Sequence, residues 1–544
     1  MRFIFTSALV LCAWTSLVRA QAPAARVDSI FAFATSTTPG CAVSVMRNGK
    51  IEYAQGYGMA DLEHGVRITP ATPFYMASVS KQFTAAAINL LVLDGKVSLD
   101  DDARTYVPEL PSFGRTITIR HLLHHTSGLR DYLTLFSMRG LTDFPITNQD
   151  FLETIGRQRA LNFLPGDQYS YSNSGYVLLS IIVERVSGKS LRAFSDERIF
   201  KPLEMSSTQF RDRHTQLIPN RALAYARDKQ GAYTLSVPYF DVIGDGGLFS
   251  TASDIAHWEK NFLDPGIAGP RWLALEDVRG RLNDGSPLAY GAGLAFVEYR
   301  GDSVVDHGGA LGGYNIDLLR FPKRRFSVAV LCNDNSVPSG LLAQRVADVF
   351  LGDSLGMRTT PGQSRASTPP LDSQMLARHA GILFNDRTMS VRTIAVRDGK
   401  LYYNRTATDR AELVPLGLSR FRLADSDLII DLSSKDIARI EPATGSATIL
   451  HRVAPAGQVR LADFAGAFTS AELDVSWTVA VSDSVLTLRR ARADPERLEM
   501  VFDDAFRGGG MLLRFTRDAA RRVTGMDVSV GERVRNVRFE RGGR

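Results

Sequence analysis

Residues 76–93 read MASVSKQFTAAAINLLVL, and the fold prediction starts from this stretch. Apolar residues recur at helical spacing after Lys81, and Gly95 stands where a helix would stop, so the stretch predicts an amphipathic helix. Ser78 falls at the start of that helix, and one helical turn brings the Lys81 amine beside the Ser78 hydroxyl. A serine hydroxyl is a weak nucleophile until a neighbour removes its proton, which a partly desolvated lysine can do. Ser78 and Lys81 are therefore the candidate nucleophile and base.

Two further short motifs follow along the chain. The triplet YSN at residues 171–173 ends a loop that opens a predicted helix over about residues 175–186. The triplet HGG at residues 307–309 comes just before a predicted strand. About one or two chance matches to S-x-x-K are expected in a chain of this length, so that pattern alone is weak. The three elements together, in this order, carry the prediction.

With these motifs the chain resembles the class C serine β-lactamases, the low-molecular-weight penicillin-binding proteins, and the esterases and D-aminopeptidases that share their fold. The resemblance covers about residues 24–355 and includes HTSGL at residues 125–129 and GGLFS at residues 246–250. S-x-x-K and K-T-G are established motifs of neighbouring enzymes in this group. The resemblance implies an α+β catalytic domain, with an antiparallel sheet and a helical subdomain, that needs no metal or other cofactor.

The resemblance also implies a role for each matching residue. Ser78 attacks a carbonyl carbon and forms an acyl-enzyme. Lys81 and Tyr171 share the general acid and base work of acylation and of activating the deacylating water. Asn173 orients the acyl side of the substrate.

The remaining candidate residues lie around the HGG triplet. His307, Gly308 and Gly309 are expected to contact the substrate. The backbone N–H groups of Ser78 and Ala310 are expected to form an oxyanion hole. Loss of one such donor typically costs about 10²–10³ in rate.

His307 departs from the K-T-G pattern, which has lysine at this position. Lysine is a cation near neutral pH and suits a substrate carboxylate, whereas histidine has a reference pKa of about 6.5 and is only partly charged. The change argues against penicillins and resembles the H-x-G motif of D-aminopeptidases and related esterases. We therefore expect a small-molecule or short-peptide substrate, with a D-amino-acid amide or peptide ahead of a carboxylic ester. The alternatives are a carboxylesterase, a class C-like β-lactamase or DD-peptidase, and a non-catalytic envelope sensor that binds cell-wall fragments.

The chain of 544 residues predicts roughly three domains at about 100–200 residues each. Residues 24–355 alternate strand-like and helix-like runs, with strands at both ends and a helical block between them, which predicts the α+β class. A linker rich in Thr, Pro, Ser and Gly is predicted over residues 356–372. Residues 373–455 and 458–544 then predict two small all-β, barrel-like domains.

The two barrel predictions depend on an internal duplication. LARHAG at residues 376–381 echoes LADFAG at 461–466, and TIAVRD at 393–398 echoes TVAVSD at 478–483, with both pairs offset by 85 residues. Two pairs of matching segments would rarely share the same offset by chance. The repeat therefore predicts two similar antiparallel modules that close off exposed strand edges, and D-aminopeptidases of the group also carry two C-terminal β-barrels.

The first twenty residues predict a secretory signal peptide, with Arg2 before an apolar run and a cleavage site after Ala20. The apolar run is shorter than the roughly 20 residues that a membrane-spanning helix needs, and no later segment is long and apolar enough to span a bilayer. We therefore expect a secreted or periplasmic protein. The net charge of +6 is spread over 64 basic and 58 acidic residues without a dense basic block, so no nucleic-acid partner is predicted.

Two cysteines, Cys41 and Cys332, lie beyond the predicted signal peptide, each in a strand-like run. Two cysteines outside any C-x-x-C pattern cannot form a metal-binding framework. Two buried thiols are slightly favoured over a single disulfide formed in an oxidising compartment.

Three other patterns suggest different chemistry and are set aside. GDSLG at residues 352–356 matches G-x-S-x-G, but a helix precedes it and a linker follows, whereas a nucleophile elbow needs a strand and then a helix. YYN at residues 402–404 fits Y-x-N but comes after the HGG triplet. His121, His124 and His125 lack nearby acidic or cysteine ligands at suitable spacing and are expected to be structural.

Overall fold

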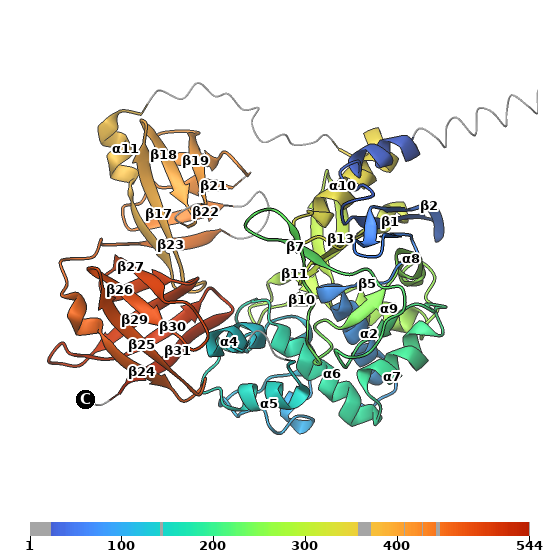
Figure 1. Cartoon of the computed structure of the whole chain (residues 1–544), viewed down its shortest axis with the longest axis horizontal. Coiled ribbons are helices and arrows are strands. Elements are labelled where there is room, and N and C mark those ends of the chain that lie inside the picture. The colour runs from blue at the N-terminus through green and yellow to red at the C-terminus, as the bar shows by residue number, and fades with distance from the viewer. Residues whose placement is uncertain are drawn as a thin grey trace, which may run out of the picture. The chain divides into compact units, whose positions relative to one another are not determined.

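The computed structural model describes residues 23–141, 145–356, 371–406, 409–426, 428–441 and 447–542. The predicted signal peptide and most of the predicted linker lie outside the described residues. The chain divides into two compact units. Figure 1 labels the helices and strands and colours them by residue number. The first unit comprises Met1–Leu129, Asp143–Gly156 and Phe163–Met357, and the second comprises Arg130–Thr142, Arg157–Asn162 and Arg358–Arg544. No helix among the described residues has the length and apolar character required to cross a membrane.

The first unit is built on an eight-stranded antiparallel sheet, in which an N-terminal hairpin pairs with strands from much later in the chain. In hydrogen-bonding order its strands are β10 (Arg279–Arg281), β11 (Pro287–Gly291), β12 (Ala295–Tyr299), β13 (Asp302–Leu311), β14 (Tyr314–Phe321), β15 (Phe326–Cys332), β1 (Cys41–Arg47) and β2 (Lys50–Tyr57). Asn48 and Gly49 turn the hairpin with φ values of 51° and 77°, as a two-residue type I′ turn requires. The predicted α+β class is confirmed.

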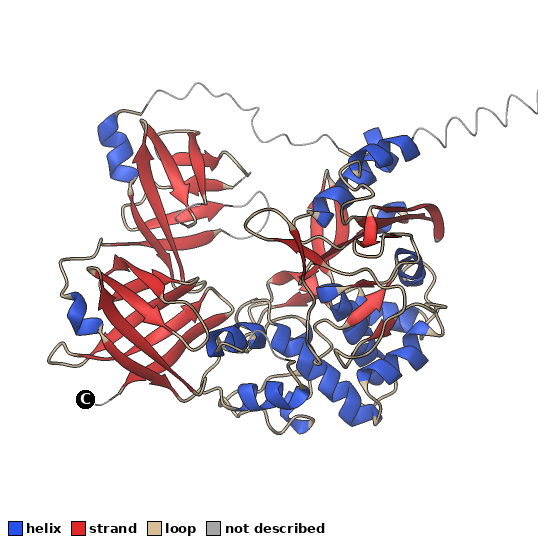
Figure 2. Ribbon diagram, in the orientation of Figure 1, coloured by secondary structure: helices blue, strands red, loops and turns tan. Residues whose placement is uncertain are grey.

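Short strands and helices complete the first unit. The short strands are β3 (Met59–Asp61), β4 (Val66–Arg67), β5 (Phe74–Tyr75), β6 (Gln209–Phe210), β7 (Tyr225–Arg227), β8 (Tyr233–Leu235) and β9 (Leu248–Ser250). The helices are α2 (Ser80–Leu93), α3 (Ile119–Leu123), α5 (Asn148–Gly156), α6 (Asn173–Ser187), α7 (Leu191–Ser195), α8 (Ala252–Asn261), α9 (Pro270–Glu276) and α10 (Ser339–Leu351). Helix α10 packs on β14 and β15, and α8 packs on β1 and β15. Figure 2 shows the contrast between this mixed unit and the strand-rich C-terminal part.

Helix α2 differs from its prediction in one respect. The sequence predicts an amphipathic helix, but every residue from Ser80 to Leu91 is buried, because α2 contacts α6, α7 and α9. Two of its polar side chains form hydrogen bonds inside the protein. Gln82 accepts a hydrogen bond from Trp258 Nε1 (2.8 Å), and Asn89 donates one to Glu276 (2.7 Å). A helix that is buried on all sides is a central element of its domain.

Cys41 and Cys332 form a disulfide that joins residues 291 positions apart. They are direct partners across β1 and β15, and neither side chain is exposed. The slight preference for two buried thiols was therefore wrong. Nothing local in the sequence shows that β1 and β15 are neighbours, so the pairing could not be read from either strand alone.

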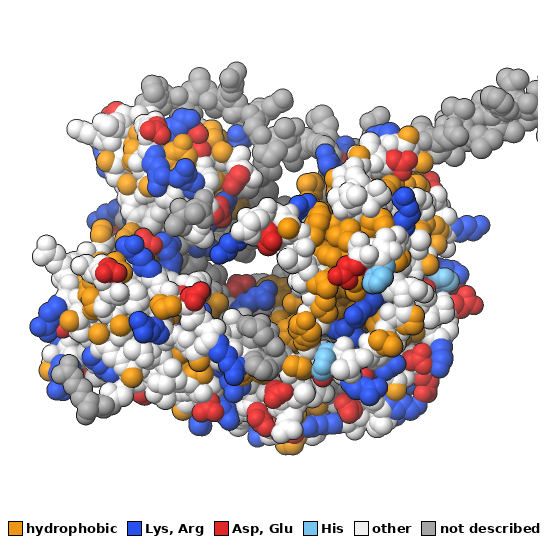
Figure 3. Space-filling view, viewed as in Figure 1, with side chains coloured by type: hydrophobic (Ala, Val, Ile, Leu, Met, Phe, Trp, Pro, Cys, Tyr) orange, Lys and Arg blue, Asp and Glu red, His pale blue; other side chains and the backbone are white. Residues whose placement is uncertain are grey.

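The C-terminal part contains two closed eight-stranded barrels, as the duplication predicts. Helix α11 (Ser373–His379) precedes the first, whose strands are β16 (Gly381–Asn385), β17 (Ser390–Arg397), β18 (Lys400–Asn404), β19 (Arg410–Pro415), β20 (Arg420–Leu423), β21 (Ile429–Asp431), β22 (Ile437–Glu441) and β23 (Thr448–Val453). The strands of the second are β24 (Gly466–Ser470), β25 (Val475–Ser482), β26 (Val485–Arg489), β27 (Glu496–Phe502), β28 (Ala505–Gly508), β29 (Met511–Arg517), β30 (Val523–Val530) and β31 (Val534–Arg541). Figure 3 shows basic and acidic side chains interspersed over this face of the barrels.

The structure explains why the repeated LAxxAG motif ends in glycine. In each barrel an arginine of the last strand donates hydrogen bonds to backbone carbonyl groups just before that glycine. A Cβ on Gly381 would lie 2.8 Å from Arg452 Nη1, and a Cβ on Gly466 would lie 3.0 Å from Arg541 Nε. A side chain at either position would require the guanidinium to shift, and the φ values of these glycines, 151° and 156°, are ones that residues with side chains rarely adopt.

The second unit also contains helix α4 (Tyr132–Arg139) and a buried ion pair. Arg130 pairs with Glu472 in the β24–β25 turn, and both side chains are almost fully buried. The guanidinium also donates to the carbonyl of Arg535 (2.9 Å) and to Gln158 Oε1 (3.0 Å). These hydrogen bonds offset the cost of removing the charges from water.

We predict that reduction of the Cys41–Cys332 disulfide lowers the free energy of unfolding by about 2–4 kcal/mol, because the bond restricts the unfolded chain. Urea denaturation with and without a reductant measures this change. The double variant Cys41→Ala/Cys332→Ala should be insensitive to the reductant. Equal thiol counts in denatured protein before and after reduction would contradict the disulfide.

Candidate active site

Ser78 lies in a strained turn at the entry to the central helix. The turn is a single 3-10 turn, η1 (Ala77–Val79), that leads directly into α2. Ala77 has a φ of 45°, which is uncommon for a residue with a side chain, and such strain often occurs at functional sites. Within the described stretch from Thr72 to Leu91, only Ser78 is not buried. The fold therefore presents this hydroxyl at an opening in an otherwise closed region.

Lys81 is fully buried and reaches three acceptors from three parts of the chain. Its Nζ donates to Ser78 Oγ (3.2 Å), to Asn173 Oδ1 (2.9 Å) and to the backbone carbonyl of Asp245 (2.7 Å). An ammonium group has three N–H donors, so these acceptors use all of them. The structure thus brings together Ser78, Lys81 and Asn173, of which the motif spacing predicted only the Ser78–Lys81 pair.

The Tyr171 ring contacts the same ammonium. Lys81 Nζ is 4.9 Å from the centroid of the Tyr171 ring, within the range of a cation–π contact. Helix α6 begins at Asn173, and Tyr171 lies just before the N-cap residue Ser172. The Tyr171 ring also packs against the His125 ring, with 4.3 Å between centroids.

His307, on β13, is buried and has both ring nitrogens engaged by the protein. Nδ1 lies 2.7 Å from the Gly308 carbonyl oxygen, which can only accept, so Nδ1 carries a proton. Nε2 lies 3.0 Å from the Tyr290 hydroxyl. Burial, together with the positive charge of Lys81, lowers the pKa of His307 to about 4. His307 is therefore neutral near pH 7 and accepts the Tyr290 hydrogen bond at Nε2.

The glycines after His307 differ in what surrounds them. A Cβ on Gly309 would lie 2.4 Å from the Met76 carbonyl oxygen and 3.1 Å from Ser78 N, so β13 passes very close to η1. A Cβ on Gly308 would meet nothing closer than 3.7 Å. Ala310, the next residue of β13, is exposed. The absence of a side chain at Gly309 lets the backbone around Ala310 approach the Ser78 N–H.

Several groups at the site were not found from the sequence. Asp245 contributes a backbone carbonyl, which no side-chain pattern can show, although its neighbours belong to the GGLFS region. Tyr290 lies on β11 with no motif around it. Tyr176 contacts the Lys81 ammonium at 5.6 Å and donates a hydrogen bond to the Leu123 carbonyl (2.8 Å). A search for polar residues one or two turns beyond Asn173 would have found Tyr176.

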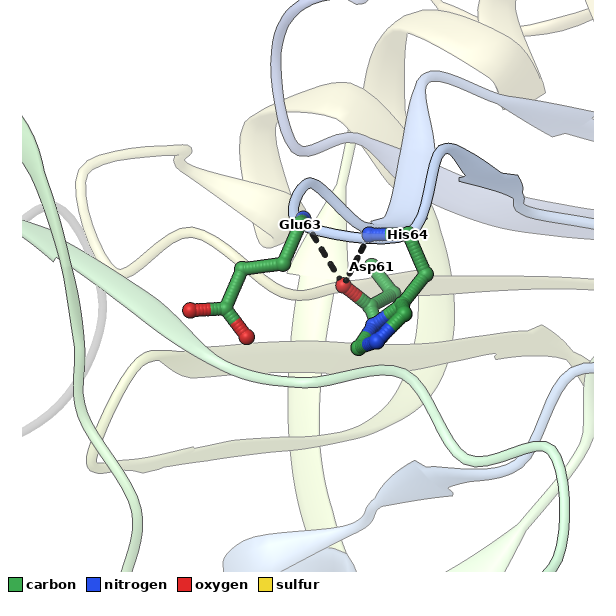
Figure 4. A group of neighbouring side chains, drawn as sticks. All are labelled: Asp61, Glu63 and His64. Carbon is green, nitrogen blue, oxygen red and sulfur yellow. Dashed lines mark hydrogen bonds and ion pairs between the residues drawn. The ribbon is translucent and has the colours of Figure 1, made fainter.

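Among the described residues, one cluster has donor atoms close enough together to hold a metal ion: Asp61, Glu63 and His64. Figure 4 shows that it forms a turn between β3 and β4. Asp61 Oδ1 accepts the backbone N–H groups of Glu63 (2.8 Å) and His64 (3.1 Å), and Oδ2 lies 2.8 Å from His64 Nδ1. Hydrogen bonding within the turn accounts for this cluster.

The three neighbouring histidines have structural contacts. His121 Nδ1 accepts the backbone N–H of Thr118 (3.2 Å) in a capping box, and His125 Nδ1 accepts that of Ser172 (3.2 Å). Burial lowers the pKa of His124 to about 4. These contacts agree with the structural interpretation.

The two competing motifs also have structural explanations. Ser354 lies in a 3-10 turn (Gly352–Ser354) directly after α10, and its hydroxyl donates to the Leu351 carbonyl and accepts from Arg324. A helix and not a strand lies directly before this turn, whereas a nucleophile elbow follows a strand. The YYN triplet at residues 402–404 belongs to β18 of the first barrel.

Comparison with known sequences identifies the family and several relatives of this chain. A family model described as Beta-lactamase matches residues 27–350. A D-aminopeptidase of Gluconobacter oxydans (strain 621H) is 31% identical over 351 residues, which cover 63% of this chain and 64% of that protein. A D-aminopeptidase of Brucella ovis is 32% identical over 310 residues, which cover 54% of this chain and 56% of that protein. The chain thus matches less than two thirds of the length of these relatives.

Solved structures with the same fold include an octameric penicillin-binding protein homologue from Pyrococcus abyssi. It has a TM-score of 0.55 and 22% identity, and the match covers 88% of this chain and 98% of the homologue. A D-amino acid amidase from Ochrobactrum anthropi SV3 has a TM-score of 0.51 and 24% identity, and the match covers 60% of this chain and 98% of the amidase. At these identities the similarity shows the fold alone.

We predict that Gly309→Ala slows covalent labelling of Ser78 by a fluorophosphonate by about 10²-fold, because the new Cβ forces β13 away from η1 and its N–H donors. Gly308→Ala should have a much smaller effect, since its Cβ meets only ordinary contacts. Melting temperatures check that both variants are folded. Equal labelling rates for the two variants would contradict this steric account.

A second prediction concerns the pH dependence of stability. His307 has a folded-state pKa of about 4, below its ordinary value, so the unfolded chain takes up this proton first as the pH falls. The free energy of unfolding should therefore fall between about pH 6.5 and pH 4, by roughly 1.4 kcal/mol per pH unit for this one group. Urea denaturation of the protein and of His307→Asn over that range measures the difference. An identical slope in both proteins would contradict a neutral, buried His307.

Proposed function

The chain belongs to the beta-lactamase family, and from that premise we propose a serine hydrolase that cleaves short D-amino-acid amides or peptides through an acyl-enzyme on Ser78. The observation that carries the proposal is the buried Lys81 amine, which donates to both Ser78 Oγ and Asn173 Oδ1. The relatives named D-aminopeptidase support the substrate class.

In the acylation step, the Ser78 oxygen attacks the substrate carbonyl carbon and loses its proton. An ammonium that donates three hydrogen bonds cannot accept that proton. Either Lys81 first releases a proton to solvent when substrate enters and its neutral amine accepts the Ser78 proton, or Tyr171 is ionised beside the Lys81 cation and its phenolate oxygen accepts that proton. The carbonyl oxygen becomes an oxyanion, which the N–H groups of Ser78 and Ala310 stabilise.

The remaining steps return the enzyme to its starting state. The C–N bond of the tetrahedral intermediate breaks, and the amine leaves with the proton that Ser78 lost. Water then attacks the acyl carbon of the ester on Ser78 while the same base accepts one of its protons. The C–O bond to Ser78 breaks, the base returns the proton to Ser78 Oγ, and the carboxylic acid product leaves. Asn173 is suited to orient the acyl group, because its side chain is fixed by Lys81 at the start of α6.

The charge of the site supports an uncharged group on the leaving side of the substrate. His307 occupies the position where K-T-G enzymes have a lysine cation, and it is neutral with both ring nitrogens engaged by Tyr290 and Gly308. A substrate carboxylate would therefore gain no ion pair there. An amide or peptide bond meets this condition better than a penicillin, which carries a carboxylate.

A carboxylesterase is the second candidate, because a neutral His307 suits an ester equally well. The Ser78 oxygen, activated beside Lys81, would attack an ester carbonyl in the same way, and an alcohol is an easier leaving group than an amine. A direct comparison of amide and ester substrates decides between the two.

We also propose that the protein is exported. The signal-like residues 1–20 motivate this location, and the Cys41–Cys332 disulfide supports it, because disulfides persist in oxidising compartments.

We predict that purified protein hydrolyses D-amino-acid p-nitroanilides with a kcat/KM at least about tenfold above that for the L-enantiomers and for nitrocefin. Ser78→Ala should lower the rate by at least about 10³-fold, whereas the matched control Ser354→Ala should retain it. Steady-state kinetics on D- and L-anilides, nitrocefin and short p-nitrophenyl esters measure this. Turnover of esters alone would favour the esterase, and activity in Ser78→Ala would exclude the proposed nucleophile.

A further inference from the structure

His125 lies in the loop after α3 and holds the backbone on both sides of Tyr171. Its carbonyl oxygen accepts the N–H of Ser170 (3.0 Å), and its ring Nδ1 accepts the N–H of Ser172 (3.2 Å). The side chain is buried, with 1% of its surface exposed. One residue thus fixes the chain immediately before and immediately after the candidate catalytic tyrosine.

The ring of His125 also contacts the Tyr171 ring directly. The centroids are 4.3 Å apart and the planes are tilted by 36°. Tyr290 and Tyr176 pack on the same imidazole at 4.7 Å and 5.1 Å. His125 is therefore the common contact of an aromatic cluster, and two of its members, Tyr171 and Tyr176, also contact the Lys81 ammonium at 4.9 Å and 5.6 Å.

The backbone of His125 is held in a strained conformation. Its φ is 56°, in the left-handed region that residues with side chains seldom adopt. Such a conformation persists only where the surrounding structure fixes it, and it is common next to active sites. In this loop the strained φ places the carbonyl and the ring of one residue against the same short segment, Ser170–Ser172.

The hydrogen bonds also define the protonation state of the imidazole. Nδ1 accepts a backbone N–H, so the ring proton is on Nε2. Burial and the positive charge of Lys81 keep the pKa of His125 well below its ordinary value. The neutral form is the one that can accept the Ser172 N–H, and a proton on Nδ1 would break that contact.

We propose that His125 is a positioning residue for the reaction, which holds Tyr171 against Lys81 and sets the start of α6 so that Asn173 reaches the same amine. The link runs from the imidazole to Ser172, and from there to Asn173, whose Oδ1 accepts from Lys81 at 2.9 Å. This inference rests on the proposed function, because it assumes that Tyr171 takes part in proton transfer.

Two amide substitutions test the role of Nδ1. His125→Asn places an oxygen near the position of Nδ1, and asparagine tolerates a left-handed φ. His125→Gln carries the same amide one carbon further out, where it cannot meet the Ser172 N–H in the same way. We expect His125→Gln to lower kcat by about 10²-fold and to change KM by less than about threefold, because a small misplacement of a catalytic group slows chemistry more than binding. His125→Asn should recover most of that loss.

The readouts separate positioning from simple loss of stability. Melting temperatures and the rate of fluorophosphonate labelling of Ser78 are measured for both variants, on whichever substrate class the parent protein turns over. If His125→Gln does not fold, His125→Phe replaces it, since phenylalanine keeps the aromatic packing but has no acceptor.

Three results would overturn the proposal. The first is a kcat of His125→Gln equal to that of the parent protein. The second is an equal loss of kcat in His125→Asn and His125→Gln while both melt at the parent temperature. The third is a change in KM with no change in kcat. Failure of the proposed function has a different signature, because Ser78→Ala would then remain active or the parent would label elsewhere, whatever residue 125 is.

Discussion

The burial of the Lys81 amine is the constraint on which the site depends. Removing an ammonium from water costs on the order of several kcal/mol unless its donors are satisfied. Here the three N–H donors reach Ser78, Asn173 and the Asp245 carbonyl, which come from three distant parts of the sequence. The fold must therefore bring η1, the start of α6 and the loop before β9 to one point, and the reactive arrangement follows from satisfying this one charge.

The same constraint explains the glycines around Asp245. Gly244 has a φ of 111°, and a Cβ there would lie 2.5 Å from the carbonyl oxygen of Tyr176. Gly247 has a φ of 92°. These residues let the loop pack tightly against α6 while the Asp245 carbonyl turns toward Lys81. Elsewhere in the chain, Arg130 and Arg541 are accommodated in the same way, each by several carbonyl or carboxylate acceptors.

Local patterns in the sequence predicted much of this structure. Ser78 and Lys81 are three residues apart, so a single helical turn was enough to predict that their side chains meet, and in the structure they form a hydrogen bond. The 85-residue repeat predicted two similar barrels, and two closed barrels are present. What the sequence could not show depends on contacts between distant segments. The disulfide requires β1 beside β15, the full burial of α2 requires helices on several sides, and the Asp245 carbonyl has no side-chain signal.

The central claim is that the Ser78 oxygen, activated beside Lys81, carries the acyl group during turnover. Rapid-quench mass spectrometry of the intact protein during hydrolysis of a D-phenylalanine ester or amide, followed by peptide mapping, tests it most directly. The account predicts a transient mass increase of one phenylalanyl group on the peptide that contains Ser78. Steady turnover with no adduct at any quench time, or an adduct on a peptide without Ser78, would contradict it.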